Sequence, residues 1–267
     1  MRVKVNDTMT GLRPIVELYM SEFMLVAFDQ VINEAPRLRY MSGGQVKVPV
    51  VFKAGFGFAA GWAGQHSNCI YHTMMGIPGL KIAVPSTAAD AKGLMASAIR
   101  DDNPVVYLHH YMLTLDKGEV PDGEYVIPFG VADIKRAGTD VTIVATGWMV
   151  KKSLAAAEFL AKEGISAEVV DPRTLAPLDV KTIVESVKKT GRLVLVDQAP
   201  RHASAAVVIA GEVAEHGFPY LKAPVKMVTA LDTSVPYSEP MESYVLPSEG
   251  KIVQGVKSVL AVPAAAV

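Results

Sequence analysis

The sequence predicts an α/β protein with a mainly parallel sheet, and three observations support this fold class. In the second half of the chain, short apolar runs alternate with amphipathic stretches of helical length, as in successive βαβ units. The strand candidates are β-branched and apolar throughout, which is typical of a sheet covered by helices on both faces. The 267 residues are also enough for two domains of ordinary size.

The first part of the chain gives a mixed pattern. An aromatic-rich helical spacing predicts a helix over 16–35, and 48–52 is expected to be a buried strand. Ser86 is a candidate N-cap for a helix that runs to Arg100. Its apolar side is predicted to face inward through Ala91, Leu94, Met95, Ala98 and Ile99. Another buried strand is expected over 105–108. This part lacks a full set of strand–helix units, so it looks like a domain without its beginning.

A polar connection that contains Gly and Pro, over 116–124, predicts a linker. We therefore expect one domain over 1–120 and a second over 125–262. The second alternates cleanly, with strands predicted at 141–145, 168–170, 193–196 and 225–228, and helices at 149–162, 180–189 and 204–215.

Bulk composition limits the class of protein. The net charge of −1 gives no electrostatic case for nucleic acid or a membrane surface. Half of the residues are apolar, which suggests that partner subunits cover part of the surface. The single cysteine, Cys69, excludes an intrachain disulfide framework. The first residues lack the apolar core of a signal peptide, so a cytoplasmic location is expected.

The run from Lys53 to Lys81 carries no charged side chain between its ends. Its glycines and the polar residues 65–68 argue against a membrane span. We expect a buried, tightly turning backbone that places His66 in a dry pocket, where it could move protons. A histidine in an apolar segment is more often a satisfied core residue, but these surroundings give the catalytic interpretation equal weight.

Other candidates keep two interpretations each. The segment 101–104, Asp-Asp-Asn-Pro, is either a turn after a helix or a cation site. Tyr19 and Phe23 are four residues apart on one face of the predicted helix. Such a pair is either part of the core or one wall of a pocket for a cofactor ring. His109 and His110 are adjacent on a predicted strand, so they face opposite sides and do not form a metal pair. Neither a phosphate-loop motif, nor a dinucleotide fingerprint, nor zinc spacing occurs in the sequence.

Nine short segments, taken in order, identify a family. The chain resembles the beta subunit of the thiamine-diphosphate-dependent decarboxylating component of 2-oxo acid dehydrogenase complexes, which act on pyruvate, branched-chain acids or acetoin. The resemblance extends over 11–260 and is carried by 11–17 (GLRPIVE), 28–33 (FDQVIN), 40–44 (YMSGG), 65–67 (QHS), 78–81 (PGLK), 85–87 (PST), 90–94 (DAKGL), 98–105 (AIRDDNPV) and 171–179 (DPRTLAPLD).

The resemblance implies a transketolase-like architecture, with an incomplete pyrimidine-binding domain followed by a transketolase C-terminal domain. It implies an alpha2-beta2 heterotetramer, in which the alpha subunit holds the diphosphate and Mg²⁺ and the beta subunit holds the aminopyrimidine of thiamine diphosphate. The implied reaction is decarboxylation of a small 2-oxo acid and acyl transfer to a lipoyl group on an acyltransferase core.

Site residues follow from the same resemblance. His66 matches the active-site histidine that assists acylation of the lipoyl group. Tyr19 and Phe23 match positions that line the aminopyrimidine pocket. A structural K⁺ site, bound mainly through main-chain oxygens, is implied for Val50, Ala98, Asp101 and Asn103.

The chain also departs from the family. Members carry a further N-terminal segment with the glutamate that hydrogen-bonds the pyrimidine ring, and Met1–Thr10 resembles nothing in it. Glu17 and Glu22 are not expected to replace that glutamate. Ala54-Gly55 stands where Gly-Pro is usual, and His109-His110 stands where an acidic residue is common. Two alternatives therefore stay open: a split transketolase-type chain acting on sugar phosphates, and a truncated, non-catalytic assembly subunit.

Overall fold

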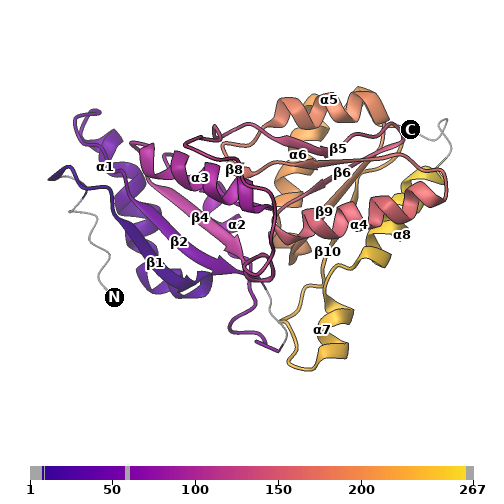
Figure 1. Cartoon of the computed structure of the whole chain (residues 1–267), viewed down its shortest axis with the longest axis horizontal. Coiled ribbons are helices and arrows are strands. Elements are labelled where there is room, and N and C mark those ends of the chain that lie inside the picture. The colour runs from indigo at the N-terminus through magenta and orange to yellow at the C-terminus, as the bar shows by residue number, and fades with distance from the viewer. Residues whose placement is uncertain (1–7, 9, 58–60, 263–267) are drawn as a thin grey trace. The chain divides into compact units, whose positions relative to one another are not determined.

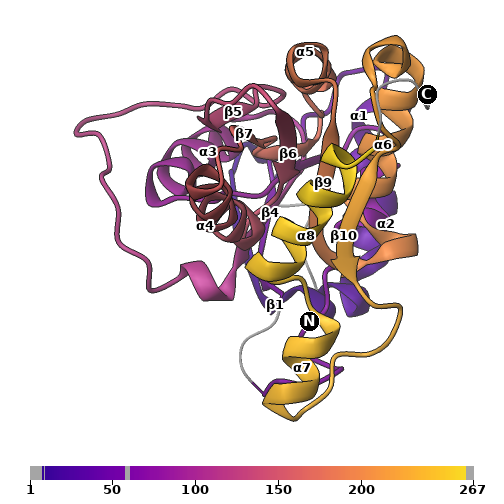
Figure 2. The same cartoon turned by 90° about the vertical axis from the view of Figure 1, so that its right-hand side faces the viewer.

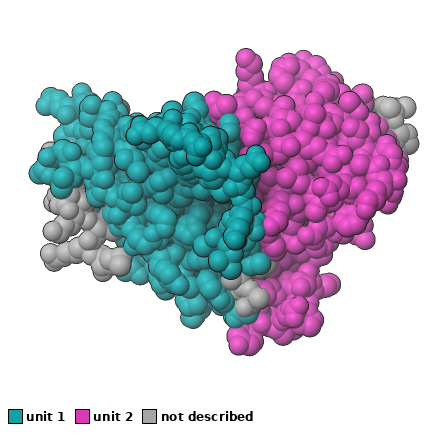
Figure 3. Space-filling view, viewed as in Figure 1, with its two compact units in different colours: residues 1–130, 173–177 teal, residues 131–172, 178–267 magenta. Residues whose placement is uncertain are grey.

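The structure is a computed structural model that describes residues 8, 10–57 and 61–262. The predictions for the first seven residues therefore lie outside the described part of the chain. The chain folds into two compact units, 1–130 with 173–177 and 131–172 with 178–267 (Figure 3). Each unit contains a five-stranded sheet (Figure 1), as the predicted α/β fold class requires. The linker position between 120 and 125 stays a prediction.

The sheet of the first unit is parallel except at one edge. Its strand order is β1-β2-β4-β3-β8, and only β8 runs antiparallel to its neighbour. The strands are β1 (Ile15–Met20), β2 (Val51–Phe56), β3 (Lys81–Ala83), β4 (Val105–His110) and β8 (Thr174–Ala176). The predicted strand over 105–108 is confirmed by β4, and the one over 48–52 is found three residues later than expected.

The predicted helix over 16–35 is wrong in its first part. Residues 15–20 form β1, which pairs in parallel with β2 through Ile15↔Val51. The chain then turns through η2 (Ser21–Ala27), the π-helical η3 (Asp29–Glu34) and α1 (Ala35–Met41). A strand followed directly by helical turns gives the same apolar spacing as a helix over so few residues. Tyr19 and Phe23 therefore do not share a helical face.

The helix α3 (Ala88–Arg100) is capped one residue later than predicted. Thr87, not Ser86, is the N-cap, because its extended backbone lets Oγ1 accept from the Asp90 amide at 3.0 Å. The Ser86 hydroxyl instead donates to the Asp90 carboxylate at 3.2 Å. The inward face is as predicted: Leu94 and Ala98 are buried against the sheet.

The second unit follows the predicted alternation closely. Its strand order is β10-β9-β6-β7-β5, parallel except for the edge strand β5. The strands are β5 (Asp133–Arg136), β6 (Val141–Ala145), β7 (Ala167–Asp171), β9 (Leu193–Pro200) and β10 (Lys226–Ala230). All four predicted strands are confirmed, whereas β5 was not predicted.

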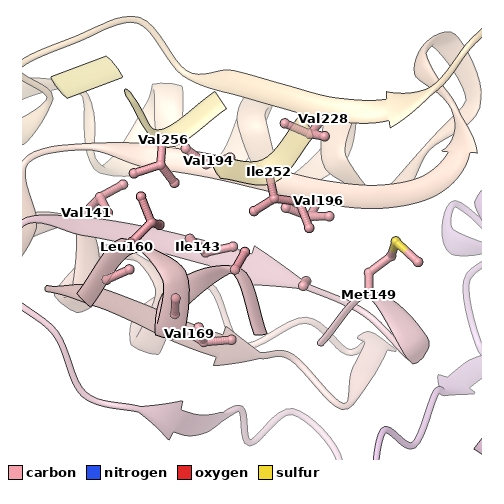
Figure 4. Packing of buried hydrophobic residues seen from close by; sticks show 14 of the residues in the cluster. Val141, Ile143, Met149, Leu160, Val169, Val194, Val196, Val228, Ile252 and Val256 are labelled. Atoms are coloured by element: carbon pink, nitrogen blue, oxygen red, sulfur yellow. The ribbon is translucent and has the colours of Figure 1, made fainter. Parts of the chain in front are cut away.

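Two pairs of helices cover this sheet (Figure 2). Side chains of β6 and β9 alternate between two apolar clusters: Ile143 and Val194 face one, Val144 and Leu195 the other. The first cluster lies under α4 (Trp148–Lys162) and α8 (Glu249–Leu260), and Figure 4 shows Leu160, Ile252 and Val256 within it. The second lies under α5 (Val180–Thr190) and α6 (Ala205–His216). The three predicted helices are confirmed, and α8 was not predicted.

The remaining elements are short. They are α2 (His72–Met75), η4 (Tyr111–Leu113), η5 (Arg201–Ala203), η6 (Phe218–Tyr220) and α7 (Glu239–Val245). Among the described residues, none of the helices has both the length and the apolar character that crossing a bilayer requires.

Candidate active site

The parallel strands of the first unit bring the candidate residues together at the carboxyl ends of the strands, which form one edge of the sheet. Tyr19 is the penultimate residue of β1, His66 follows the carboxyl end of β2, and Tyr111 comes directly after β4. Because these strands are parallel neighbours, their carboxyl ends lie at the same edge, where ligand sites of α/β proteins form. The predicted cation residues Asp101 and Asn103 precede β4. They lie at the opposite edge, on the order of 15 to 20 Å away for strands of this length.

One ring nitrogen of His66 has no hydrogen-bond partner in the described part of the chain. His66 lies half-buried in the turns between β2 and α2, and its Nδ1 is buried without a hydrogen-bond partner among the residues that the structure describes. Leaving a buried polar atom unpaired costs about 1–3 kcal/mol, so such an atom marks a position that a ligand can satisfy. The ring of Phe23 meets His66 edge-on, with ring centroids 5.8 Å apart.

Glu22 ties the segment of Phe23 to the segment of His66. Its Oε1 accepts from the Asn68 backbone amide at 2.7 Å and from Asn68 Nδ2 at 3.1 Å. Asn68 Nδ2 also donates to Gly64 O at 2.9 Å, and the Ser21 hydroxyl donates to Glu22 Oε2 at 3.2 Å. The carboxylate therefore anchors the turn that carries His66. Sequence reasoning missed this role, although an acid inside an apolar stretch was a signal for it.

Backbone strain flanks the same site. Tyr19 and Ala63 have φ angles of 56° and 57°, in the left-handed region that residues with a Cβ rarely adopt. Strain of this kind persists where surrounding contacts impose it, commonly at binding sites. The side chains of Tyr19 and Phe23 are 62% and 45% exposed, so aromatic surface is presented at this edge.

Tyr111 and His109 complete the edge from β4 and were not predicted as site residues. The Tyr111 hydroxyl donates to the Tyr19 carbonyl at 2.9 Å. Burial, with the nearby charge of Glu22, raises the pKa of Tyr111, so its hydroxyl stays a donor at neutral pH. Burial, helped by the charge of Lys53, lowers the pKa of His109, which favours its neutral form.

The predicted cation loop is surrounded by the chain's own cations. Arg13 Nη1 donates to the carbonyls of Ile99 at 3.1 Å and Asp101 at 2.9 Å, at the C-terminal end of α3. The Asp101 carboxylate is hydrogen-bonded by Lys81 and, at 2.8 Å, by the Asn103 amide. Burial alone would raise the pKa of Asp101, but these donors hold it below its usual value. The carbonyl and carboxylate oxygens of this loop are therefore paired with the cationic side chains of Arg13 and Lys81.

The other predicted ligands are nearby in the fold. The Val50 carbonyl accepts from the Val105 amide at 2.9 Å, and Ala98 lies in the last turn of α3. Arg39 Nη1 donates to Asn103 Oδ1 at 2.8 Å. Carbonyl and amide oxygens are the ligand type that hard cations take, and here the Asp101 carbonyl and Asn103 Oδ1 accept from Arg13 and Arg39, so the K⁺ site stays a prediction.

Comparisons with known proteins agree over both units. The profile of the family described as transketolase, pyrimidine binding domain, matches residues 8–114, and that of transketolase, C-terminal domain, matches 130–252. A solved structure of a split-gene transketolase, an inactive beta4 tetramer, has a TM-score of 0.79 at 25% identity, over 97% of this chain and 79% of that one.

Curated relatives are closer in sequence. The beta subunit of acetoin:2,6-dichlorophenolindophenol oxidoreductase from Cupriavidus necator is 48% identical over 94% of this chain and 74% of its own length. The subunit of the same name from Bacillus subtilis is 46% identical over 96% and 75%. The pyruvate dehydrogenase E1 component subunit beta from Rickettsia conorii is 46% identical over 96% and 78%.

Proposed function

The chain belongs to the family of E1-type beta subunits of thiamine-diphosphate-dependent pyruvate dehydrogenases and acetoin oxidoreductases, and from that premise we propose its part in the reaction. With an alpha subunit it decarboxylates a small 2-oxo acid such as pyruvate and transfers the acyl group to a lipoyl arm. The observation that carries this proposal is the buried Nδ1 of His66 beside Phe23, which has no hydrogen-bond partner among the described residues.

Thiamine diphosphate, when bound, supplies the nucleophilic carbon that attacks the 2-oxo acid. In this proposal the beta chain binds the aminopyrimidine ring, and the exposed rings of Tyr19 and Phe23 provide the aromatic surface for it. The diphosphate and its Mg²⁺ belong to the alpha subunit.

His66 serves the acyl-transfer step. Opening of the lipoyl disulfide forms a thioester at one sulfur and leaves the other as a thiolate, which needs a proton. An imidazolium ring can donate it, and Nδ1 is a ring atom with no competing partner among the described residues. The hydrogen bonds between Glu22 and Asn68 hold the turn that carries His66.

The test compares two activities of His66→Ala assembled with its alpha subunit. Reduction of an artificial dye, with pyruvate or acetoin as substrate, is expected to continue, whereas lipoyl acylation falls by about 10²–10⁴-fold. His72→Ala, six residues further on, is the matched control, because its ring contacts the Cys69 carbonyl. Equal retention of both activities in His66→Ala would remove His66 from the reaction.

Two further parts of the proposal concern ions and partners. A structural K⁺ is assigned to the oxygens of Val50, Ala98, Asp101 and Asn103, because that loop gathers cations. The alpha subunit and the lipoyl acyltransferase core are the proposed partners, in a cytoplasmic alpha2-beta2 assembly. The apolar side chains of Val26 and Tyr40, 81% and 89% exposed, support a covering partner on the first unit.

The likeness to a split-gene transketolase supports one alternative, a chain that acts on sugar phosphates. The higher identity to the dehydrogenase relatives favours the first proposal. Turnover of a ketose phosphate but of neither pyruvate nor acetoin would reverse the choice. Binding to an alpha subunit without turnover of any of these substrates would identify an assembly subunit.

A further inference from the structure

We propose that Tyr111 is a positioning residue for the cofactor ring: its hydroxyl holds the carbonyl of Tyr19 and so fixes the aromatic wall of the site. The inference rests on the proposed function of Tyr19 as part of that wall. It is carried by three independent features of the structure, which are a strained backbone, a hydrogen bond and a space left by a glycine.

The strain lies at Tyr19. The pairing of β1 with β2 runs regularly to Glu17↔Lys53 and then shifts before Met20↔Gly55. Tyr19 falls inside this irregularity with φ of 56°. An aromatic residue does not adopt this conformation without an external constraint, because its Cβ crowds the backbone.

The hydrogen bond supplies the constraint. Tyr111 follows β4, two strands away from β1, and its hydroxyl reaches the Tyr19 carbonyl at 2.9 Å. Since β4 is a central strand, the hydroxyl is held by a rigid part of the sheet. The carbonyl of Tyr19 is thereby directed to Tyr111.

The space is provided by Gly55 on the strand between them. A Cβ at this position would lie 2.2 Å from Tyr111 Cε1 and 2.6 Å from its hydroxyl oxygen. The glycine is therefore required for room and not for a special φ. Trp62 meets the Tyr111 ring with centroids 4.7 Å apart, so the ring is restrained by contacts besides the hydrogen bond.

This arrangement predicts a selective defect in Tyr111→Phe, which keeps the ring and loses only the hydroxyl. In the complex with the alpha subunit, thiamine diphosphate is expected to bind about five- to tenfold more weakly, the effect of one hydrogen bond. The loss of cofactor affinity should be larger than any loss of kcat measured at saturating cofactor. In the chain alone, hydrogen exchange over residues 18–24 should become faster.

Tyr107→Phe is the matched control. Tyr107 lies on β4, four residues before Tyr111, and its hydroxyl likewise donates to a backbone carbonyl, that of Ala91, at 3.0 Å. The Tyr107→Phe variant loses an equivalent hydrogen bond, but one that lies away from the candidate site, so its affinity for the cofactor should not change. A second variant, Gly55→Ala, displaces the Tyr111 ring and should weaken cofactor binding, whereas in a Tyr111→Ala background it should add nothing.

The outcomes separate this inference from the proposed function. If the wild-type complex binds thiamine diphosphate and Tyr111→Phe binds it equally well, the role of Tyr111 is wrong and the function stands. If kcat falls while affinity stays unchanged, the positioning role is also wrong. If the wild-type complex does not bind the cofactor, the proposed function is wrong, and the role of Tyr111 falls with it.

Discussion

At the scale of single residues, the site depends on side chains that connect segments far apart in the sequence. Glu22 lies 46 residues before Asn68, and Tyr111 lies 92 residues after Tyr19, yet each pair is hydrogen-bonded. His66, Tyr19 and Phe23 could be chosen from the sequence because a resemblance pointed to them. Glu22 and Tyr111 could not, because their roles exist only once the strands are paired.

The anchoring role of Glu22 gives a prediction for stability and activity together. Glu22→Ala leaves the Asn68 amide without its acceptor, so the free energy of unfolding should fall by about 1–3 kcal/mol. Lipoyl acylation should fall as well, because the turn that carries His66 is released. Urea unfolding and the acylation assay measure the two effects.

Glu17→Ala is the control for this variant. Glu17 pairs with Lys53 at a side-chain exposure of 48%, and an exposed ion pair contributes no more than about 1 kcal/mol. If both variants lose the same stability and neither affects acylation, Glu22 is an ordinary surface carboxylate.

At the scale of elements, the second unit was predictable and the start of the first was not. Strands such as β6 are apolar at every position but one and buried throughout, and a run of this kind bounded by turns is recognisable without tertiary information. The strand β1 is exposed or half-exposed at five of its six positions, so its pattern carried no such signal. The antiparallel strand β5 was missed for the same reason, since none of its residues is fully buried.

The N-terminus of α3 tests how finely a sequence can define an element. Thr87→Ala removes the acceptor of the Asp90 amide and should destabilise the chain by about 1 kcal/mol. Ser86→Ala leaves that cap intact and should cost less. Thermal and urea unfolding of the two variants compare them directly. If Ser86→Ala loses more free energy of unfolding than Thr87→Ala, Ser86 is the N-cap, as the sequence predicts.

At the scale of the whole molecule, many large apolar side chains lie outside the hydrophobic cores and are exposed. Large apolar side chains such as Tyr40 and Leu115 are 89% and 90% exposed. A sequence with half of its residues apolar predicts partner subunits, and these exposed side chains agree with that prediction. Which partner covers which surface depends on shape, and composition carries no information about it.

The proposed K⁺ site concerns the stability of the molecule and not its chemistry, because the loop lies at the sheet edge opposite His66. A bound ion stabilises the folded state by about 2.7 kcal/mol when its concentration is a hundred times its Kd. We therefore expect a Tm several degrees higher in KCl than in choline chloride at equal ionic strength, roughly 2–4 °C for each kcal/mol in a chain of this size. Differential scanning calorimetry measures the difference.

Variants of two neighbouring aspartates test whether the difference in Tm between KCl and choline chloride comes from this site. Asp101→Ala removes the carboxylate that orders Asn103, and should abolish the advantage of K⁺. Asp102→Ala is the control, because its carboxylate pairs with Arg13 and Lys47 and is not among the proposed ligands, so the advantage should persist. Equal Tm values of the wild type in the two salts would mean that Arg13, already 2.9 Å from the Asp101 carbonyl, supplies the positive charge of this loop by itself.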